Sequence, residues 1–182
     1  APVMLDVMRE KADVLYLLGD FAQAETLLDE ALAHTHDTFD RVEVYLQKLI
    51  QYNQLGKYNE LMDIARGALA MFGVTLPQAD DAPTLKRCFD SLMQDYVALL
   101  GQRPIAELIT VPDVADREQD SIIRLTAILT DGAYIAVPTL FPHLVMEVIS
   151  RSMRYGHNAM SAVGFAWATV VTGSGVSASS CL

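Results

Sequence analysis

A chain of 182 residues has room for one domain, or at most two, and for a sizeable hydrophobic core. Its formal net charge of −10 repels nucleic-acid phosphate, and its most apolar runs, residues 132–145 and 159–171, are shorter than the ~20 residues that span a bilayer. Charge and hydropathy therefore argue against nucleic acid and membrane as partners, while 52% hydrophobic and only 8% aromatic residues favour tightly stacked helices with an aliphatic core.

The N-terminal part of the chain contains one pattern twice, at an offset of 37 residues. A period of this size is typical of stacked supersecondary units. Apolar spacing predicts helices at about 3–18 and 21–35, and the same pair again at about 38–55 and 58–72. The positions Leu15, Leu18, Gly19, Phe21, Ala31 and Leu32 recur as Tyr52, Leu55, Gly56, Tyr58, Ala68 and Leu69.

Local signals mark the ends of these four helices. Gly19 and Gly56 end the first helix of each pair. Asp20 and Gln23 match a capping box for the second helix, and Asp37 or Thr38 is a suitable N-cap for the third. Each copy is therefore predicted to be a helix–glycine turn–helix hairpin.

The later elements are also predicted to be helical. After a polar loop, helices are expected at about 83–100, at about 104–109, from a cap at Asp113 to about 133, and from Pro138 or Pro142 to Tyr155. His157 or Asn158 caps a last helix that runs to about 171. No segment has a convincing strand pattern. The Gly/Ser-rich tail, residues 172–182, is predicted to be disordered.

These elements predict an all-α fold, a right-handed stack of antiparallel helix hairpins forming an α-solenoid. Residues 1–73 are expected to form two hairpins and residues 74–82 a loop. Residues 83–171 are expected to form further hairpins of the same stack, followed by the tail 172–182.

No side chains have a spacing that indicates catalysis or metal binding. His34 and His36 are two residues apart and point away from each other on a helix. His143 and His157 are interpreted as capping or packing residues, and Cys88 as a buried structural thiol. The two cysteines have no ligand spacing and favour a reducing cytoplasm. We therefore predict no catalytic, cofactor-binding or metal-binding residue, and a chain that is not an enzyme.

The aromatic residues of the repeats have two interpretations. Tyr16, Tyr45, Tyr52 and Tyr58 could line a groove that binds a peptide or a small ligand. The favoured interpretation is packing between helices, with hydroxyls that reach the surface.

Two more candidate contact surfaces lie near the C-terminal end. Arg151 and Arg154 could bind an acidic partner, or could interact with the dipole at the end of their helix. The apolar face of the last helix is expected to be exposed or to drive self-association, which predicts a homodimer or oligomer of the isolated chain. This face comprises Val163, Phe165, Trp167 and Val170.

The repeat unit resembles the tetratricopeptide repeat, although the offset of 37 exceeds the usual 34 residues. The second copy keeps Gly56, Tyr58 and Ala68 of the pattern, whereas Leu49 and Leu61 replace expected small residues, so the repeats are degenerate. The matching residues of the first copy are Ala12, Gly19, Asp20, Phe21, Ala24 and Ala31.

A wider resemblance covers residues 7–169. It consists of Leu-Leu-Gly-Asp-Phe-x-x-Ala (17–24), Leu-Gly-Lys-Tyr (55–58), Phe-Gly-Val-Thr-Leu-Pro (72–77) and Arg-Ser-Met-Arg-Tyr-Gly-His-Asn-Ala-Met-Ser-Ala (151–162). In this order they resemble the helical region that follows the ATPase module in large signalling proteins with kinase-like, GAF and sensor histidine kinase domains. The resemblance implies a non-catalytic scaffold in a cytoplasmic signal-transduction protein, with protein partners or neighbouring domains of the same chain.

Overall fold

The computed structural model describes residues 2–78, 80–101 and 111–173, and these ranges contain helices and no extended strand. The all-α fold predicted from the sequence is confirmed for these ranges. The expected short helix at 104–109 and the tail from residue 174 onward lie outside them. The helices are α1 (Pro2–Leu17), α2 (Phe21–His34), α3 (Thr38–Leu55), α4 (Tyr58–Ala70), α5 (Ala82–Leu100), α6 (Arg117–Ala136), α7 (Phe141–Tyr155) and α8 (Ser161–Gly173).

Local chemistry accounts for the boundaries of the first four helices. The Asp20 carboxylate accepts a hydrogen bond from the backbone N–H of Gln23 at 3.3 Å, which caps α2. Asp37 caps α3 by accepting from the backbone N–H groups of residues 39 and 40. Gly19 and Gly56 have φ of 82° and 70°, the left-handed conformation that glycine adopts without steric cost. The predicted capping residues and glycine turns are confirmed. The reciprocal bond of the capping box is not formed, because the Gln23 side chain donates to the Asp20 carboxylate and the Asp20 N–H donates to the carbonyl of Leu15.

The offset of 37 residues is also present in three dimensions. α2 begins at Phe21 and α4 begins 37 residues later at Tyr58. Three pairs of core residues repeat with the same offset, and all six residues are completely buried: Ala24 and Leu61, Leu28 and Ala65, Ala31 and Ala68.

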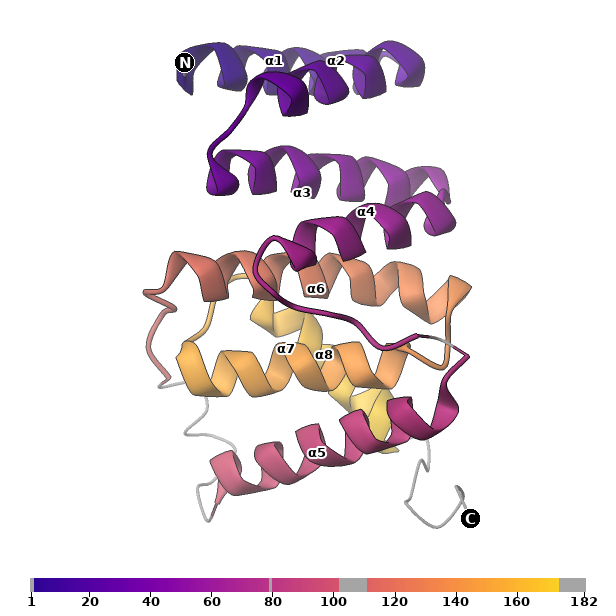
Figure 1. Cartoon of the computed structure of the whole chain (residues 1–182), viewed down its shortest axis with the longest axis vertical. Coiled ribbons are helices and arrows are strands. Elements are labelled where there is room, and N and C mark those ends of the chain that lie inside the picture. The colour runs from indigo at the N-terminus through magenta and orange to yellow at the C-terminus, as the bar shows by residue number, and fades with distance from the viewer. Residues whose placement is uncertain (1, 79, 102–110, 174–182) are drawn as a thin grey trace.

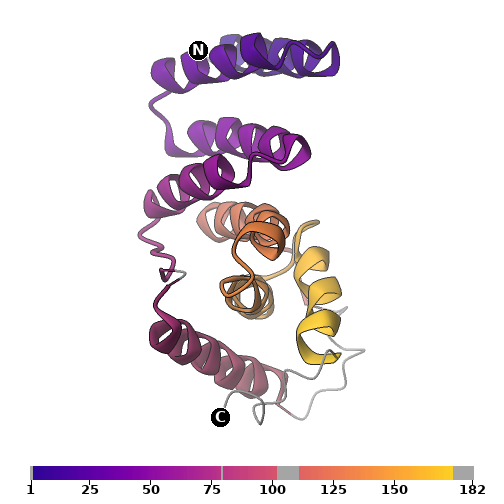
Figure 2. The same cartoon turned by 90° about the vertical axis from the view of Figure 1, so that its right-hand side faces the viewer.

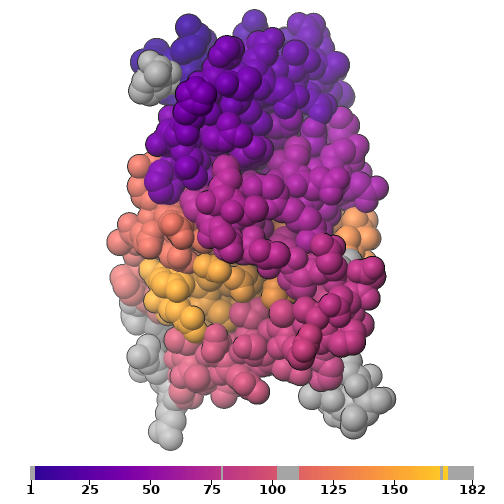
Figure 3. All heavy atoms as spheres, viewed as in Figure 1, coloured from indigo at the N-terminus to yellow at the C-terminus, as the bar shows by residue number. Residues whose placement is uncertain are grey.

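The helices pack as pairs that follow one another along the long axis (Figures 1 and 2). α1 packs against α2, α3 against α4, and α6 against α7. α3 also contacts the first pair, and α6 contacts both helices of the second pair. α1 and α2 therefore form one end of the molecule, and α5 forms the other (Figure 3).

After residue 83 the helices do not stack in the order in which they follow one another in the chain. α6 packs against α3 and α4, whereas α5 packs against α7. The connector after α4 explains the displacement. Leu76 is buried in the main core, and Arg66 donates hydrogen bonds to the carbonyls of Leu76 and Pro77, at 3.2 and 3.4 Å. The connector then runs past α6 and α7 to α5 (Figure 1).

The start of α6 also differs from the prediction. Its N-cap is Asp116, whose carboxylate accepts a hydrogen bond from the N–H of Glu118 at 2.8 Å, and not Asp113. The backbone beside Asp113 is engaged elsewhere, because the Val114 N–H donates to the carbonyl of His157 at 2.8 Å. This pairing joins segments more than forty residues apart, so local sequence could not indicate it.

The last helix, α8, packs closely on α7. The Asn158 side chain accepts hydrogen bonds from the N–H groups of Met160 and Ser161 at 2.9 and 3.0 Å, which confirms one of the two predicted caps. A Cβ built on Gly164 would lie 2.6 Å from Cγ1 of Val148, so only glycine allows this approach. α8 extends to Gly173, and the start of the predicted disordered tail, residues 172 and 173, is therefore helical.

Candidate binding groove between α1 and α3

A groove of about 400 Å³ lies between α1 and α3, with one side chain contributed by α6. Two exposed aliphatic residues, Leu17 (81% exposed) and Ile50 (46%), lie in it beside amide and charged groups. Its volume falls within the range of ligand sites, although its lining is more polar than is usual for them. The lining comprises Arg9, Asp13, Tyr16, Leu17, Glu43, Leu46, Gln47, Ile50, Gln51, Gln54 and Arg124.

Buried amides hold the two walls of the groove together. The Gln47 side chain donates to the backbone carbonyl of Arg9 at 2.8 Å and to the carboxylate of Asp13 at 2.6 Å. Gln51 donates to the same carboxylate at 3.4 Å. Both glutamines are buried, whereas Gln54 is exposed and lines the groove. The position of α1 over α3 is therefore set by hydrogen bonds as well as by apolar packing.

The charged groups of the groove neutralise one another. Arg124 donates two hydrogen bonds to the Glu43 carboxylate, at 2.5 and 3.0 Å, and Arg9 lies 3.5 Å from it. Burial alone would raise the pKa of Glu43, but the hydrogen bonds and charge of Arg124, with the charge of Arg9, lower it below its usual 4.5. Glu43 is thus a firmly ionised, paired carboxylate, which suits it to shape a binding surface rather than to exchange protons.

The structure does not bring the four predicted tyrosines to one groove, and Tyr58, at the start of α4, is not part of its lining. Tyr16 lines the groove, while Tyr52 is buried on the opposite side of α3. The Tyr52 hydroxyl donates to Glu25, and burial together with this hydrogen bond raises the pKa of Tyr52. Tyr45 packs against the main core and its hydroxyl accepts from Arg41 at 3.1 Å. Tyr45 and Tyr52 are therefore packing residues, which was the favoured interpretation of the sequence.

The two arginines of α7 are engaged within the molecule. Arg151 donates to Glu147 at 2.6 Å and to Gln119 of α6 at 2.7 Å. Arg154 donates to Asp95 of α5 at 2.9 Å. Both line a cavity of about 190 Å³ between α5 and α7. The arginines connect α7 to its neighbours, a role that neither interpretation of the sequence included.

The apolar face of α8 is largely directed inward. Trp167 stacks on Tyr134 and packs edge-on against Phe141, and its Nε1–H donates to Asp131 at 3.0 Å. Phe165 packs beside His157 with ring centroids 5.5 Å apart. Phe165, Trp167 and Val163 are half-buried and pack on the hydrophobic core, and Val170 is 37% exposed.

The other candidate residues do not converge on a reactive site. His143 is buried, and burial lowers its pKa; burial also lowers the pKa of His157. Cys88, expected to be buried, is half-buried on α5. Within the described ranges, no three side chains of His, Cys, Asp or Glu lie together as a metal site requires. None of the helices in those ranges combines the length and the apolarity that crossing a membrane requires.

Sequence reasoning missed most of the groove. One signal was present: Gln47, Gln51 and Gln54 follow one another at helical spacing on a face of α3. Amides in such a stripe indicate a helix face that forms hydrogen bonds to another chain segment. The partners of Glu43 could not be inferred, because Arg124 lies 81 residues further along the chain.

Comparisons with known proteins identify no relative of this chain. The chain matches no protein-family model, no curated protein and no solved structure.

Proposed function

We propose that this chain is a non-catalytic helical-repeat scaffold, a right-handed stack of antiparallel helix hairpins that binds a segment of a partner protein in the groove between α1 and α3. The observation that carries the proposal is the groove itself. Its exposed aliphatic side chains, Leu17 and Ile50, lie beside the exposed amide of Gln54, and hydrogen bonds of Gln47 connect its two walls. Surfaces of this kind recognise extended or helical peptide segments.

The repeat arrangement is supported by the internal correspondence between the first two helix pairs. Glycine turns, helix starts and buried positions agree at the offset of 37 residues. The pair α6 and α7 takes the next position, because α6 contacts both α3 and α4. Such units bury their apolar faces only against neighbours, and their stacks generally present extended binding surfaces.

The charge balance of the groove indicates the chemistry of the segment. Two cations, Arg9 and Arg124, are matched by two carboxylates, Asp13 and Glu43. A strongly charged peptide therefore gains little here. We expect a neutral segment that places one or two aliphatic side chains on Ile50 and Leu17, with backbone groups bonded to Gln54.

The biological setting is proposed from the sequence resemblance alone. It places the scaffold in a cytoplasmic signal-transduction protein, where its partner would be a neighbouring domain or another signalling protein. The alternative is a helical-repeat module that binds a small ligand in the same groove. Of the tyrosines proposed from the sequence, Tyr16 is the one that lines this groove.

The proposal is tested by selecting a random displayed peptide library on the full chain. We expect selected peptides to bind at least tenfold more weakly to Ile50→Asp, a loss of about 1.4 kcal/mol. Ile135→Asp is the matched control, because Ile135 is 58% exposed at the C-terminal end of α6, outside the groove. Circular dichroism checks that both variants fold.

Two results would overturn this function. One is a selection without enriched peptides. The other is a set of peptides whose binding is equally sensitive to both substitutions. The small-ligand alternative predicts no peptide enrichment, together with thermal stabilisation by small compounds that Ile50→Asp removes.

A further inference from the structure

The internal repeat shows what covers one face of α3. Val44, Gln47, Lys48 and Gln51 are all buried on this face, and α1 and α2 cover it. Val44 is completely buried in a cluster with residues of the first pair. The members contributed by α1 and α2 are Leu5, Ala12, Leu28 and Ala31.

Polar contacts complete this cover, among them the hydrogen bonds of Gln47 and Gln51 to the Asp13 carboxylate. The Lys48 ammonium, on a nearly buried side chain, pairs with the Asp29 carboxylate of α2. The Gln47 side-chain oxygen accepts a hydrogen bond from Nε of Arg9 of α1 at 3.3 Å. A helix pair that covers this face thus supplies alanine and leucine side chains, two carboxylates (Asp13 and Asp29) and one cation.

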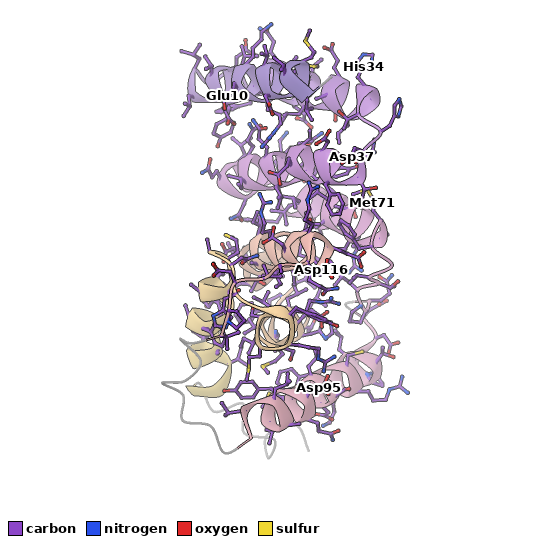
Figure 4. The ribbon with its side chains drawn as sticks, turned by 90° about the vertical axis from the view of Figure 1, so that its left-hand side faces the viewer. Glu10, His34, Asp37, Met71, Asp95 and Asp116 are labelled. Atoms are coloured by element: carbon purple, nitrogen blue, oxygen red, sulfur yellow. The ribbon has the colours of Figure 1, made fainter. Side chains whose placement is uncertain are left out.

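The equivalent face of α1 is uncovered. At the offset of 37 residues, Val44, Gln47, Lys48 and Gln51 correspond to Val7, Glu10, Lys11 and Val14. Val7 is 56% exposed and Val14 is 54% exposed, and the two charged residues between them are exposed as well. Figure 4 shows Glu10 on the outermost helix pair. Three further exposed apolar residues extend the face: Val3, Met4 and Leu18.

We propose that this outward face of α1 is a docking surface for a helical hairpin of a partner protein, with the chemistry that α1 and α2 present to α3. The hairpin places alanine and leucine side chains on Val7, a carboxylate beside Lys11 and a cation beside Glu10. Where α3 has Gln51, α1 has Val14, so the partner carries an apolar residue there in place of Asp13. The proposal adds a second contact surface to the proposed repeat scaffold.

The way α1 and α2 cover the equivalent face of α3 favours a helical hairpin as the occupant over a second copy of the same face. Lys11 and Glu10 lie near the middle of the apolar stripe from Val3 to Leu18. In a two-fold, isologous dimer Glu10 of one copy can lie against Lys11 of the other, so a second copy is an occupant that the test has to exclude. A dimer of the unextended chain that Val7→Asp dissociates would overturn the proposal.

The test uses a second copy of the chain's own first helix pair as the hairpin and attaches it to the N-terminal end of the full chain. Residues 1–37, with Asp13→Leu in the added copy, are placed directly before Ala1, which preserves the period of 37 residues. If the added copy docks, helical circular dichroism rises by the two added helices and the urea midpoint of the chain increases. An added copy without helical signal overturns the proposal.

Substitutions on α1 then locate the contact. Val7→Asp is expected to leave the midpoint of the original chain unchanged, because Val7 is exposed there, and to lower the midpoint of the extended chain. Lys11→Glu is expected to behave in the same way. Asp29→Lys in the added copy should restore the midpoint lost by Lys11→Glu. Equal effects in both chains, or no restoration, would refute docking on this face.

The groove test and this test fail independently. Ile50 lies in the groove between α1 and α3, whereas Val7 is not part of its lining. A chain that binds no peptide at the groove could still accept the hairpin, and the reverse also holds.

Discussion

Three glycines inside helices provide a graded test of how closely the helices pack. A Cβ added to Gly67 in α4 would meet no atom within 4 Å. At Gly132 in α6 it would lie 2.9 Å from Cδ2 of Leu61, the mobile end of a side chain. At Gly164 in α8 it would lie 2.6 Å from Cγ1 and 3.0 Å from Cβ of Val148. Substitution by alanine adds the same atom in three different spaces.

The expected free energies follow from two opposing effects. Alanine in a helix interior gains about 0.8–1 kcal/mol over glycine. Overpacking costs about 1–3 kcal/mol where neighbours cannot move. Val148 is completely buried, β-branched and restricted at χ1, so relief at Gly164 requires a shift of α8. We expect Gly67→Ala to stabilise by about 1 kcal/mol, Gly132→Ala to be near neutral and Gly164→Ala to destabilise by about 1 kcal/mol.

Urea unfolding followed by circular dichroism measures all three variants. With a typical slope of about 2 kcal/mol/M, the midpoints of Gly67→Ala and Gly164→Ala should differ by roughly 1 M, in opposite directions from the original chain. If Gly164→Ala is as stable as Gly67→Ala, α8 does not pack on α7 as described, and the inward orientation of its apolar face is refuted.

Three other predictions concern single contacts. Burial lowers the pKa of His143 below 6.5, so the unfolded chain binds a proton at this imidazole more readily than the folded chain. The stability that the neutral imidazole contributes is complete above pH 6.5 and is lost as the pH falls from there through the folded-state pKa. A pH series of urea titrations should show a smaller loss of stability in His143→Gln, and an unchanged loss would contradict this prediction. Asp29→Asn should cost about 1.5–3 kcal/mol in the same assay, because it weakens the charge-assisted bond of the buried Lys48 ammonium, whereas an unchanged midpoint would show that water replaces the carboxylate. The fluorescence of Trp167, the only tryptophan, should shift at the same urea midpoint as the helical signal, and an earlier shift would show that α8 undocks first.

The boundaries of the first four helices could be predicted because their determinants are local. Asp20 and Asp37 reach backbone groups only two or three residues away. Gly19 and Gly56 provide the left-handed turn within their own pairs. The start of α6 could not be predicted in this way, because Asp113 is a suitable cap in isolation and the distant backbone of His157 engages its neighbour Val114.

The candidate site was less predictable than the helices. A tyrosine suggests a contact surface by its chemistry, but the direction in which a helix face points depends on what packs against it. Tyr52 is turned toward Glu25 of the preceding helix pair, and only Tyr16 reaches the groove. The arginines of α7 likewise donate to side chains of α5 and α6, which lie too far away in the sequence for a local pattern to indicate the contact.

The sequence by itself determined that the chain is helical, where most helices begin and end, and that two pairs repeat at 37 residues, since capping, glycine turns and apolar periodicity act over a few residues. Only the tertiary structure decided that α6 follows α4 in the packing order, that α5 lies on α7, and that α1 and α3 enclose a groove. The physical reason is that an apolar stripe specifies which side of a helix is buried. Which helix covers that side depends on contacts between residues far apart in the chain, such as Arg124 with Glu43 and Leu76 with the core.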